Sequence, residues 1–185
     1  MGTIKTTNIQ SISGSGTVTL GTSGETFTVP SGVTVNMSSA TQTGVGGANT
    51  PMFSAYINGN QSIANTTATT VAYNTEVFDT GSDFNNSTYK WTVPETAKYL
   101  MNVRMAFDSS AEFASYFSIV KDGVGDMFSI QMGHDEASDT ITGSLVLSLT
   151  ASDVYYVQAY QSSGGAVNLI GNHQNSEFSV IKLIG

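Results

Sequence analysis

Apolar and polar residues alternate along most of the chain after residue 50, with the two-residue period of β-strands. The odd-numbered positions from 99 to 107 are apolar, whereas Asn102 and Arg104 lie between them. A leucine likewise recurs at every second position from 145 to 149. No window has a convincing 3.6-residue period, so the pattern predicts strands and no helix.

Several further segments carry the same β-type pattern: 113–121, 126–132, 140–150, 154–161 and 177–184. Turn-forming sequences lie between these segments: Lys121-Asp122-Gly123, Ser162-Ser163-Gly164-Gly165 and Gly171-Asn172. Strands at regular spacing without intervening helices are typical of a β-sandwich or jelly roll. The pattern therefore predicts an all-β fold.

The first 50 residues carry a weaker version of this pattern. Three short stretches alternate apolar residues with polar ones, mostly Thr: 17–20, 26–29 and 33–37. Turn sequences separate them at Gly21–Gly24 and Pro30–Gly32. Their apolar side chains are too few and too small to form a core, and an isolated hairpin is marginal in water. We expect this arm to be ordered only against its own domain, sister subunits or a larger assembly.

Charged and aromatic side chains are concentrated after residue 50. Before it, Lys5 and Glu25 are the only charged residues and Phe27 is the only aromatic one. Cores are built from large side chains, so the globular domain is predicted in the second part. We predict an N-terminal β-rich docking arm over residues 1–50 and a jelly-roll domain over residues 51–185.

The overall composition excludes several classes of protein. Thr, Ser, Asn and Gly make up 80 of the 185 residues, but 39% of the chain is hydrophobic, which argues against disorder. Fourteen acidic against six basic residues give a net charge of −8, so no nucleic acid and no anionic membrane is expected as a partner. The chain has no cysteine and no apolar run of the ~20 residues that span a membrane.

A signature spacing lies between residues 73 and 103. It begins with an aromatic residue, followed after a spacer of five residues by Asn or Asp. A second aromatic residue follows after a spacer of four, and a third after a spacer of six. After a further spacer of five residues comes Gly-x-Tyr-x-Phe-x-aromatic. The matching positions are Tyr73, Asp79, Phe84, Trp91, Ala97, Tyr99, Met101 and Val103. This stretch resembles the C1q/tumour-necrosis-factor-like globular domain. Ala97 replaces the family's Gly, which suggests that the preceding turn needs no positive φ here.

Two later blocks extend the resemblance over residues 52–185. Residues 142–149, with Leu147 and Leu149, resemble the family's Ser-Gly-Ser…Leu-x-Leu segment, and Ser152 follows where a Gly is usual. Residues 177–183, with Phe178, resemble the closing Phe-Ser-Gly-Phe-Leu strand. The resemblance implies a C1q/TNF-like ten-stranded jelly-roll sandwich that assembles as a tight homotrimer.

The last strand has apolar residues on both faces. Phe178, Val180 and Ile184 point one way, and Ile181 and Leu183 point the other. A strand buried on both faces needs cover from beyond its own sandwich. A neighbouring subunit would supply that cover, which places Phe178, Ile181 and Leu183 at a trimer interface. The alternative is a central strand that lies under the arm.

The arm carries a second, compositional resemblance. Residues 17–26, followed by Val29-Pro30-Ser31-Gly32, resemble segments of structural proteins of tailed phages from aquatic bacteria. This resemblance implies a virion structural protein whose arm docks by strand addition or groove binding. The expected apolar anchors are Ile4, Ile9, Ile12, Val18, Leu20, Phe27 and Val29.

Together, these features lead to a non-enzymatic function. A homotrimeric capsid decoration or cement protein fits best, with the major capsid protein or another virion protein as partner. Its location would be the particle surface, after synthesis in the host cytoplasm, because no apolar signal core begins the chain. The alternatives are a tail-fibre or appendage tip that binds a host receptor or surface glycan, and a secreted Ca²⁺-dependent adhesin.

Candidate catalytic and metal-binding residues are few. The two histidines are His134 and His173, and no nucleophile-elbow motif accompanies them, so we expect no enzyme. Asp135, Glu136 and Asp139 offer the carboxylate oxygens that Ca²⁺ prefers. EF-hand spacing is missing, and a solvated loop tip explains the same residues. We therefore expect no metal ion and no cofactor.

Four tyrosines are candidate sugar-stacking residues if they are exposed: Tyr116, Tyr155, Tyr156 and Tyr160. Burial in the sandwich core is the alternative, and the surrounding strand pattern favours it.

Overall fold

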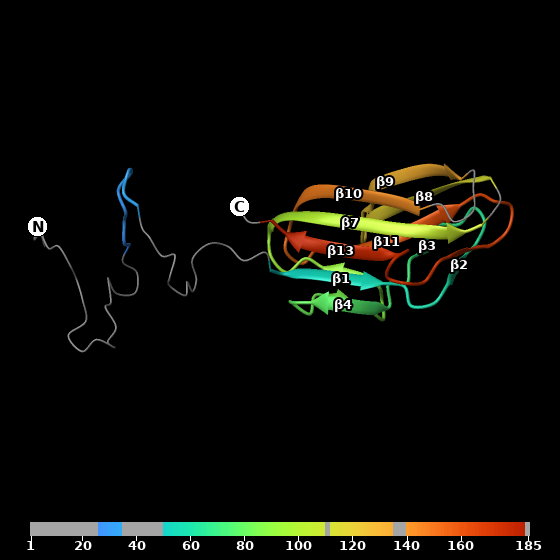
Figure 1. The fold of residues 1–185 in the computed structure, drawn as a ribbon, viewed down its shortest axis with the longest axis horizontal. Coiled ribbons are helices and arrows are strands. Elements are labelled where there is room, and N and C mark those ends of the chain that lie inside the picture. Colours follow the sequence, from blue (N-terminus) through green and yellow to red (C-terminus); the bar gives the residue numbers. More distant parts are fainter. Residues whose placement is uncertain (1–25, 35–49, 110–111, 135–139, 184–185) are drawn as a thin grey trace, which may run out of the picture. The chain divides into compact units, whose positions relative to one another are not determined.

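The structure is a computed structural model that describes residues 26–34, 50–109, 112–134 and 140–183. From residue 50 onward the described residues form a sandwich of two antiparallel sheets without a helix (Figure 1). The strands are β1 (Met52–Tyr56), β2 (Gln61–Ile63), β3 (Thr69–Thr70), β4 (Thr75–Asp79), β5 (Phe84–Asn85), β6 (Lys90–Thr92), β7 (Ala97–Asp108), β8 (Phe113–Lys121), β9 (Gly125–His134), β10 (Thr140–Leu149), β11 (Val154–Gln161), β12 (Val167–Leu169) and β13 (Glu177–Lys182).

The strand order is that of a jelly roll. The first sheet runs β2-β12-β7-β13-β1-β4, and β10 pairs with the other side of β7; in Figure 1, β10, β7, β13, β1 and β4 follow one another from top to bottom. The second sheet runs β5-β6-β11-β8-β9, and β3 also pairs with β11. The predicted all-β jelly roll is confirmed. The described residues form thirteen strands where the resemblance implies ten, and five of the thirteen have only two or three residues: β2, β3, β5, β6 and β12.

The family-signature residues form the core between the sheets. Trp91 packs edge-on against Tyr99, with their ring centroids 5.2 Å apart. The buried apolar side chains of the signature positions are those of Tyr73, Phe84, Trp91, Tyr99, Met101, Val103, Leu149 and Phe178, and Leu147 packs half-buried against them. Each of these strands thus places at least one large aromatic or aliphatic side chain into the layer between the sheets. The spacing of these residues in the sequence therefore reflects the spacing of the strands.

Asp79 is the polar member of the signature and shapes a loop. Its Oδ1 accepts a hydrogen bond from the backbone N–H of Gly81 (3.2 Å), and its Oδ2 accepts one from that of Phe84 (2.9 Å). An Asn or Asp side chain is suited to this role because it can satisfy backbone donors a few residues ahead. The loop thereby delivers the Phe84 ring into the core, where it stacks on Phe53 with centroids 4.7 Å apart.

The chain divides into two compact units, Met1–Thr43 and Gly44–Gly185. In the first unit, the predicted turn at Pro30–Gly32 is present: Val33 N–H donates to the Pro30 carbonyl (3.3 Å), and Gly32 has φ +84°. Residues 26–34 contain no strand in the single chain, and the strand expected at 26–29 against a partner surface stays a prediction. Alternation produces a strand only where a neighbouring strand completes the hydrogen-bond ladder.

The predicted docking residues of the arm fall into two groups. Phe27 and Val29 are described, and both side chains are exposed, to 69% and 37%. The remaining anchors lie outside the described residues: Ile4, Ile9, Ile12, Val18 and Leu20.

In the described part of the chain, no helix is long and apolar enough to cross a membrane.

Candidate functional site

Two of the three residues predicted at the trimer interface, Ile181 and Leu183, draw attention to the outer face of the first sheet. The third, Phe178, does not lie on that face. Phe178 is fully buried inside the sandwich, and its ring meets Phe53 edge-on with centroids 5.1 Å apart. Placing Phe178 at a subunit interface is therefore wrong. Ile181, three residues later, points away from the core and pairs with Leu100, which also faces outward. Leu183 is half-buried just beyond the strand.

Four apolar residues form a row across this outer face. Met52 on β1 pairs with Ile181 on β13, Ile181 pairs with Leu100 on β7, and Leu100 pairs with Val146 on β10. Residues directly opposite one another on adjacent strands share a face, so these four side chains are neighbours. Three are half-buried, and Val146 is 55% exposed. We call Met52, Leu100, Val146 and Ile181 the apolar row.

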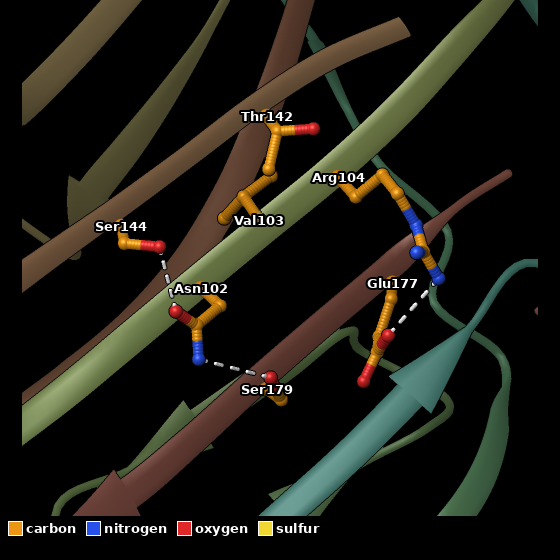
Figure 2. Close-up of a pocket in the computed structure, with 7 residues that line it drawn as sticks. All are labelled: Asn102, Val103, Arg104, Thr142, Ser144, Glu177 and Ser179. Atoms are coloured by element: carbon orange, nitrogen blue, oxygen red, sulfur yellow. Dashed lines mark hydrogen bonds and ion pairs between the residues drawn. The ribbon is translucent and has the colours of Figure 1, made fainter. Parts of the chain in front are cut away.

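Small polar residues occupy the next row along the same strands. Ser144 Oγ donates to Asn102 Oδ1 (2.8 Å), and Asn102 Nδ2 donates to Ser179 Oγ (3.5 Å), as Figure 2 shows. This row is part of a hollow of about 310 Å³, which is lined by Asn102, Val103, Arg104, Thr142, Ser144, Glu177 and Ser179. Most side chains that line the hollow are polar, and those of Thr142, Ser144 and Ser179 are short.

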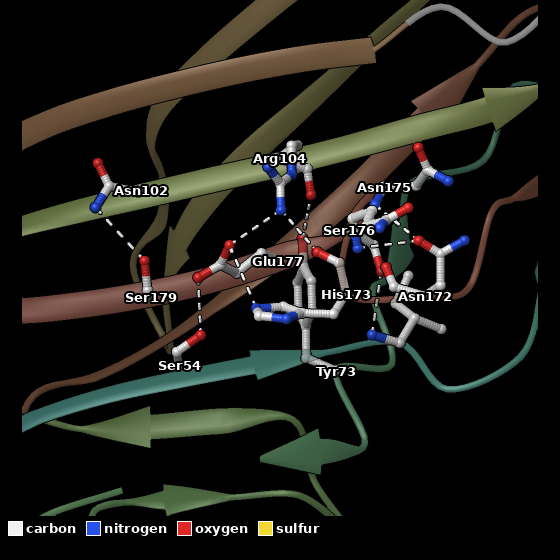
Figure 3. A network of polar contacts seen from close by, with 12 residues as sticks. Ser54, Tyr73, Asn102, Arg104, Asn172, His173, Asn175, Ser176, Glu177 and Ser179 are labelled. Carbon is white, nitrogen blue, oxygen red and sulfur yellow. Dashed lines mark hydrogen bonds and ion pairs between the residues drawn. The ribbon is translucent and has the colours of Figure 1, made fainter. Parts of the chain in front are cut away.

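A charged pair lies at the end of the hollow. Arg104 Nη2 donates to Glu177 Oε2 (3.1 Å) and to the His173 backbone carbonyl (2.7 Å) (Figure 3). The other carboxylate oxygen of Glu177 accepts a hydrogen bond from Ser54 Oγ (2.8 Å). Both oxygens of Glu177 are thus satisfied within the chain. Arg104 Nε is buried and has no hydrogen-bond partner among the described residues.

Tyr73 supports this pair from the core side. Its hydroxyl donates to the Arg104 backbone carbonyl (3.4 Å). Burial raises the pKa of Tyr73 far above its usual range, the Glu177 carboxylate raises it further, and only Arg104 acts in the opposite direction. The hydroxyl therefore stays protonated and remains a donor, so it acts as a fixed support and not as an acid or base.

The loop before β13 positions His173. Asn172 Oδ1 accepts hydrogen bonds from the backbone N–H groups of Gln174 (3.0 Å) and Asn175 (2.9 Å), which closes a tight turn. The His173 ring lies 5.4 Å from that of Tyr56, and its Nε2 is 3.8 Å from Glu177 Oε2. His173 is thus a half-exposed loop residue.

These contacts do not make a catalytic arrangement. The Ser54 hydroxyl donates to a carboxylate and not to His173, so it lacks the base that would activate a nucleophile. No group of three His, Asp or Glu side chains that could hold a metal ion occurs within the described ranges. The candidate Ca²⁺ ligands Asp135, Glu136 and Asp139 lie outside the described residues.

The sequence indicated some residues of the outer face of the first sheet but not their partners on the neighbouring strands. Asn102 and Arg104 were visible as the polar positions of an otherwise apolar strand, which was the available signal. Their partners Ser144, Ser179 and Glu177 come from strands that are 42 to 77 residues away. The register that brings them together is a property of the folded sheet.

Comparison with known proteins agrees with this architecture. The family model described as the C1q domain matches residues 52–180. Murine APRIL is similar in structure, with a TM-score of 0.55 and 16% identity over 71% of this chain and 98% of that one. Eiger TNF from S. frugiperda has a TM-score of 0.52 and 14% identity over 72% of this chain and 93% of that one. No curated protein matches the chain in sequence.

Proposed function

Because the chain belongs to the C1q domain family, and C1q/TNF-like domains commonly form trimers, we propose that three copies associate through the outer face of the first sheet. Domains of this type are typically non-enzymatic ligand-binding or structural modules. The resulting trimer is a structural building block and not an enzyme.

The apolar row is the observation that carries this proposal. Its four side chains lie on four adjacent strands of the outer face, and Val146 is more than half exposed. Burial of apolar surface stabilises association by roughly 25 cal/mol per Å². The Glu177 carboxylate, which lies beyond the polar row on the same face, is already hydrogen-bonded to Ser54 and Arg104, so covering this surface would not leave that charge unpaired.

Charged substitutions on the two outer faces test the proposed interface. Val146→Asp introduces a carboxylate into the apolar row, and Met127→Asp introduces the same group at a 43% exposed position on β9 of the second sheet. Sedimentation velocity should show a dissociated Val146→Asp chain and an unchanged Met127→Asp trimer. A Val146→Asp chain that sediments like the unsubstituted protein at the same concentration contradicts the interface.

We further propose that the trimer is a capsid decoration protein of a phage particle and docks through its N-terminal arm. The arm has two charged residues in its first 50 positions, so it can lie along another protein without desolvating many ions. Phe27 and Val29 offer exposed apolar side chains for such a contact. Three arms per trimer would multiply weak single contacts through avidity.

Removal of residues 1–37 tests the docking role separately from assembly. The truncated chain should remain a trimer but fail to co-sediment with particles that lack the protein. The matched control is Val124→Asp, a 70% exposed position in the C-terminal unit, which should bind particles normally. Particle binding by the truncated chain rules out the arm as the anchor.

The distribution of copies separates the two virion roles. Copies spread over the shell in an electron cryo-microscopy map of the particle support decoration. A few copies confined to the tail support the tail-fibre or appendage-tip alternative.

A further inference from the structure

Two tyrosines form a stacked pair on the outer face of the second sheet. Tyr116 on β8 pairs directly with Tyr160 on β11, and their rings stack with centroids 4.7 Å apart and an interplanar angle of 12°. Both side chains are half-buried. Tyr155, on the alternate face of β11, is in the core and is 2% exposed. The expectation that these tyrosines lie in the core is therefore right for Tyr155 and wrong for the stacked pair and for Tyr156, which is also half-buried.

A hydrogen-bonded polar cluster lies on the same face. Ser118 Oγ, two residues after Tyr116, donates to Asp126 Oδ2 (3.2 Å), and it is 2.6 Å from Ser129 Oγ. Asp126 and Ser129 are exposed on β9. Burial raises the pKa of Tyr116, and the negative charge of Asp126 raises it further.

Two amide side chains border the tyrosine pair and the cluster. Gln131 on β9 pairs with Tyr116, and Gln158 on β11 pairs with Ser118, so the register places both on this face. Each amide offers two N–H donors and one carbonyl acceptor. The surface thus combines aromatic rings with neutral donors and acceptors at neighbouring positions.

The charges on this sheet favour a neutral ligand. Lys90 pairs with Asp122, and Lys121 pairs with Asp153, each at 2.7 Å, so both lysines already have anionic partners. Of the described residues that pair with Tyr116, Ser118 and Tyr160 or belong to the polar cluster, Asp126 contributes a carboxylate and the others are uncharged. An anionic ligand would meet this carboxylate without a free cation to balance it, whereas a ligand rich in hydroxyl groups would find acceptors and donors.

We propose that the Tyr116–Tyr160 surface binds a neutral saccharide. The apolar C–H face of a pyranose ring would pack on a tyrosine ring, since aromatic side chains join large apolar area to a polar tip. The sugar hydroxyls would donate to Asp126 and exchange hydrogen bonds with Gln131 and Gln158. This binding does not depend on the proposed trimer interface, because the two outer faces lie on opposite sheets of the sandwich.

Affinity electrophoresis of the full chain through gels that contain dextran, mannan, galactan or xyloglucan tests the proposal. At least one of these neutral polysaccharides should retard the unsubstituted protein. Tyr116→Ala and Tyr160→Ala should each weaken that binding by about tenfold or more, which corresponds to ~1.4 kcal/mol. Asp126→Asn should also weaken binding.

Two controls separate loss of binding from loss of fold. Tyr116→Phe keeps the ring and should retain most of the binding. Met127→Ala removes an exposed apolar side chain from β9 and should bind normally. Near-ultraviolet circular dichroism of Trp91, which is 2% exposed in the core, reports whether each variant is folded. Absence of retardation in all four gels, or unchanged binding by folded Tyr116→Ala, overturns the proposal.

Discussion

Ser152 has a backbone conformation that L-residues rarely adopt. Its φ is +72°, and its backbone N–H donates to the Val93 carbonyl (2.7 Å), which holds the turn before β11 in place. The related segments of similar domains usually have Gly at this position. By contrast, Ala97 has no positive φ, so the turn before β7 tolerates a side chain as its sequence suggests.

Replacement of Ser152 by Gly should therefore stabilise the protein. A left-handed conformation costs an L-residue roughly 1–2 kcal/mol, and part of this gain is offset by the greater freedom of Gly in the unfolded chain. We expect Ser152→Gly to raise the free energy of unfolding by up to about 1 kcal/mol in denaturant titrations at fixed protein concentration. Ser148→Gly, in the middle of an exposed strand face, should lower it by about 0.5–1 kcal/mol. Equal effects of the two substitutions would contradict this explanation.

Asp83 is expected to make stability depend on pH. Its Oδ2 is buried and has no hydrogen-bond partner among the described residues. Burial raises the pKa of Asp83 above 3.8, and the neighbouring Asp79 carboxylate raises it further. The folded state thus binds the proton more tightly than the unfolded chain does. This carboxyl favours folding below pH 3.8, and the benefit is lost as the pH rises through the raised pKa.

Asp83→Asn should increase the free energy of unfolding at neutral pH and should do so less below pH 3.8, where the native carboxyl is already protonated. Denaturant titrations over this pH range measure the difference. Asp108→Asn removes an exposed carboxyl at the end of β7 as the control. A gain for Asp83→Asn that is the same at every pH would show that the effect does not come from titration.

At the scale of elements, Gly143 fixes how closely β10 approaches the second sheet. It pairs with Val103 on β7 and is buried. A Cβ at this position would collide with the side chains of Phe117 on β8 and Ile130 on β9. The Gly of the signature block 142–149 therefore has a packing role, because a side chain at this position would require Phe117 and Ile130 to shift.

Gly143→Ala should lower the free energy of unfolding by about 1–3 kcal/mol, as expected for overpacking. Ser144→Ala, on the outer face of the same strand, should have a smaller effect. If the collision is the cause, Ile130→Val should recover part of the loss when it is combined with Gly143→Ala. Additive losses in the double variant would point to a different cause.

Strand positions were predictable because alternation is a local signal. The segments expected at 113–121 and 154–161 match β8 and β11, and the strand expected at 140–150 ends one residue earlier. The pairing of strands was not predictable, because partners such as Leu100 and Ile181 are far apart in sequence. Phe178 was placed at the wrong surface because both faces of the last strand are apolar, and alternation does not show which face lies inside the sandwich.

The candidate surfaces depend on that same long-range register. The apolar row and the stacked tyrosines each consist of residues from different strands, and none of their members is distinctive alone. Sequence reasoning named Ile181, Tyr116 and Tyr160 but could not decide which face each would occupy. Alternation shows that two faces exist, and only strand pairing shows what lies beside each residue.

For the molecule as a whole, the two outer faces differ in chemistry. The face of the first sheet carries the apolar row next to internally paired polar groups, which suits contact with another protein surface. The face of the second sheet carries tyrosines, amides and the Asp126 carboxylate, which suits a hydroxyl-rich ligand. The separation of these faces lets self-association and saccharide binding be tested by substitutions that do not overlap.

Self-association through the first sheet is the central claim, and native mass spectrometry of the intact chain tests it most directly. The predicted result is a dominant species with the mass of three chains, and its replacement by single chains when Leu100→Asp places a charge in the centre of the apolar row. A stable single chain in the unsubstituted protein at micromolar concentration would contradict the claim.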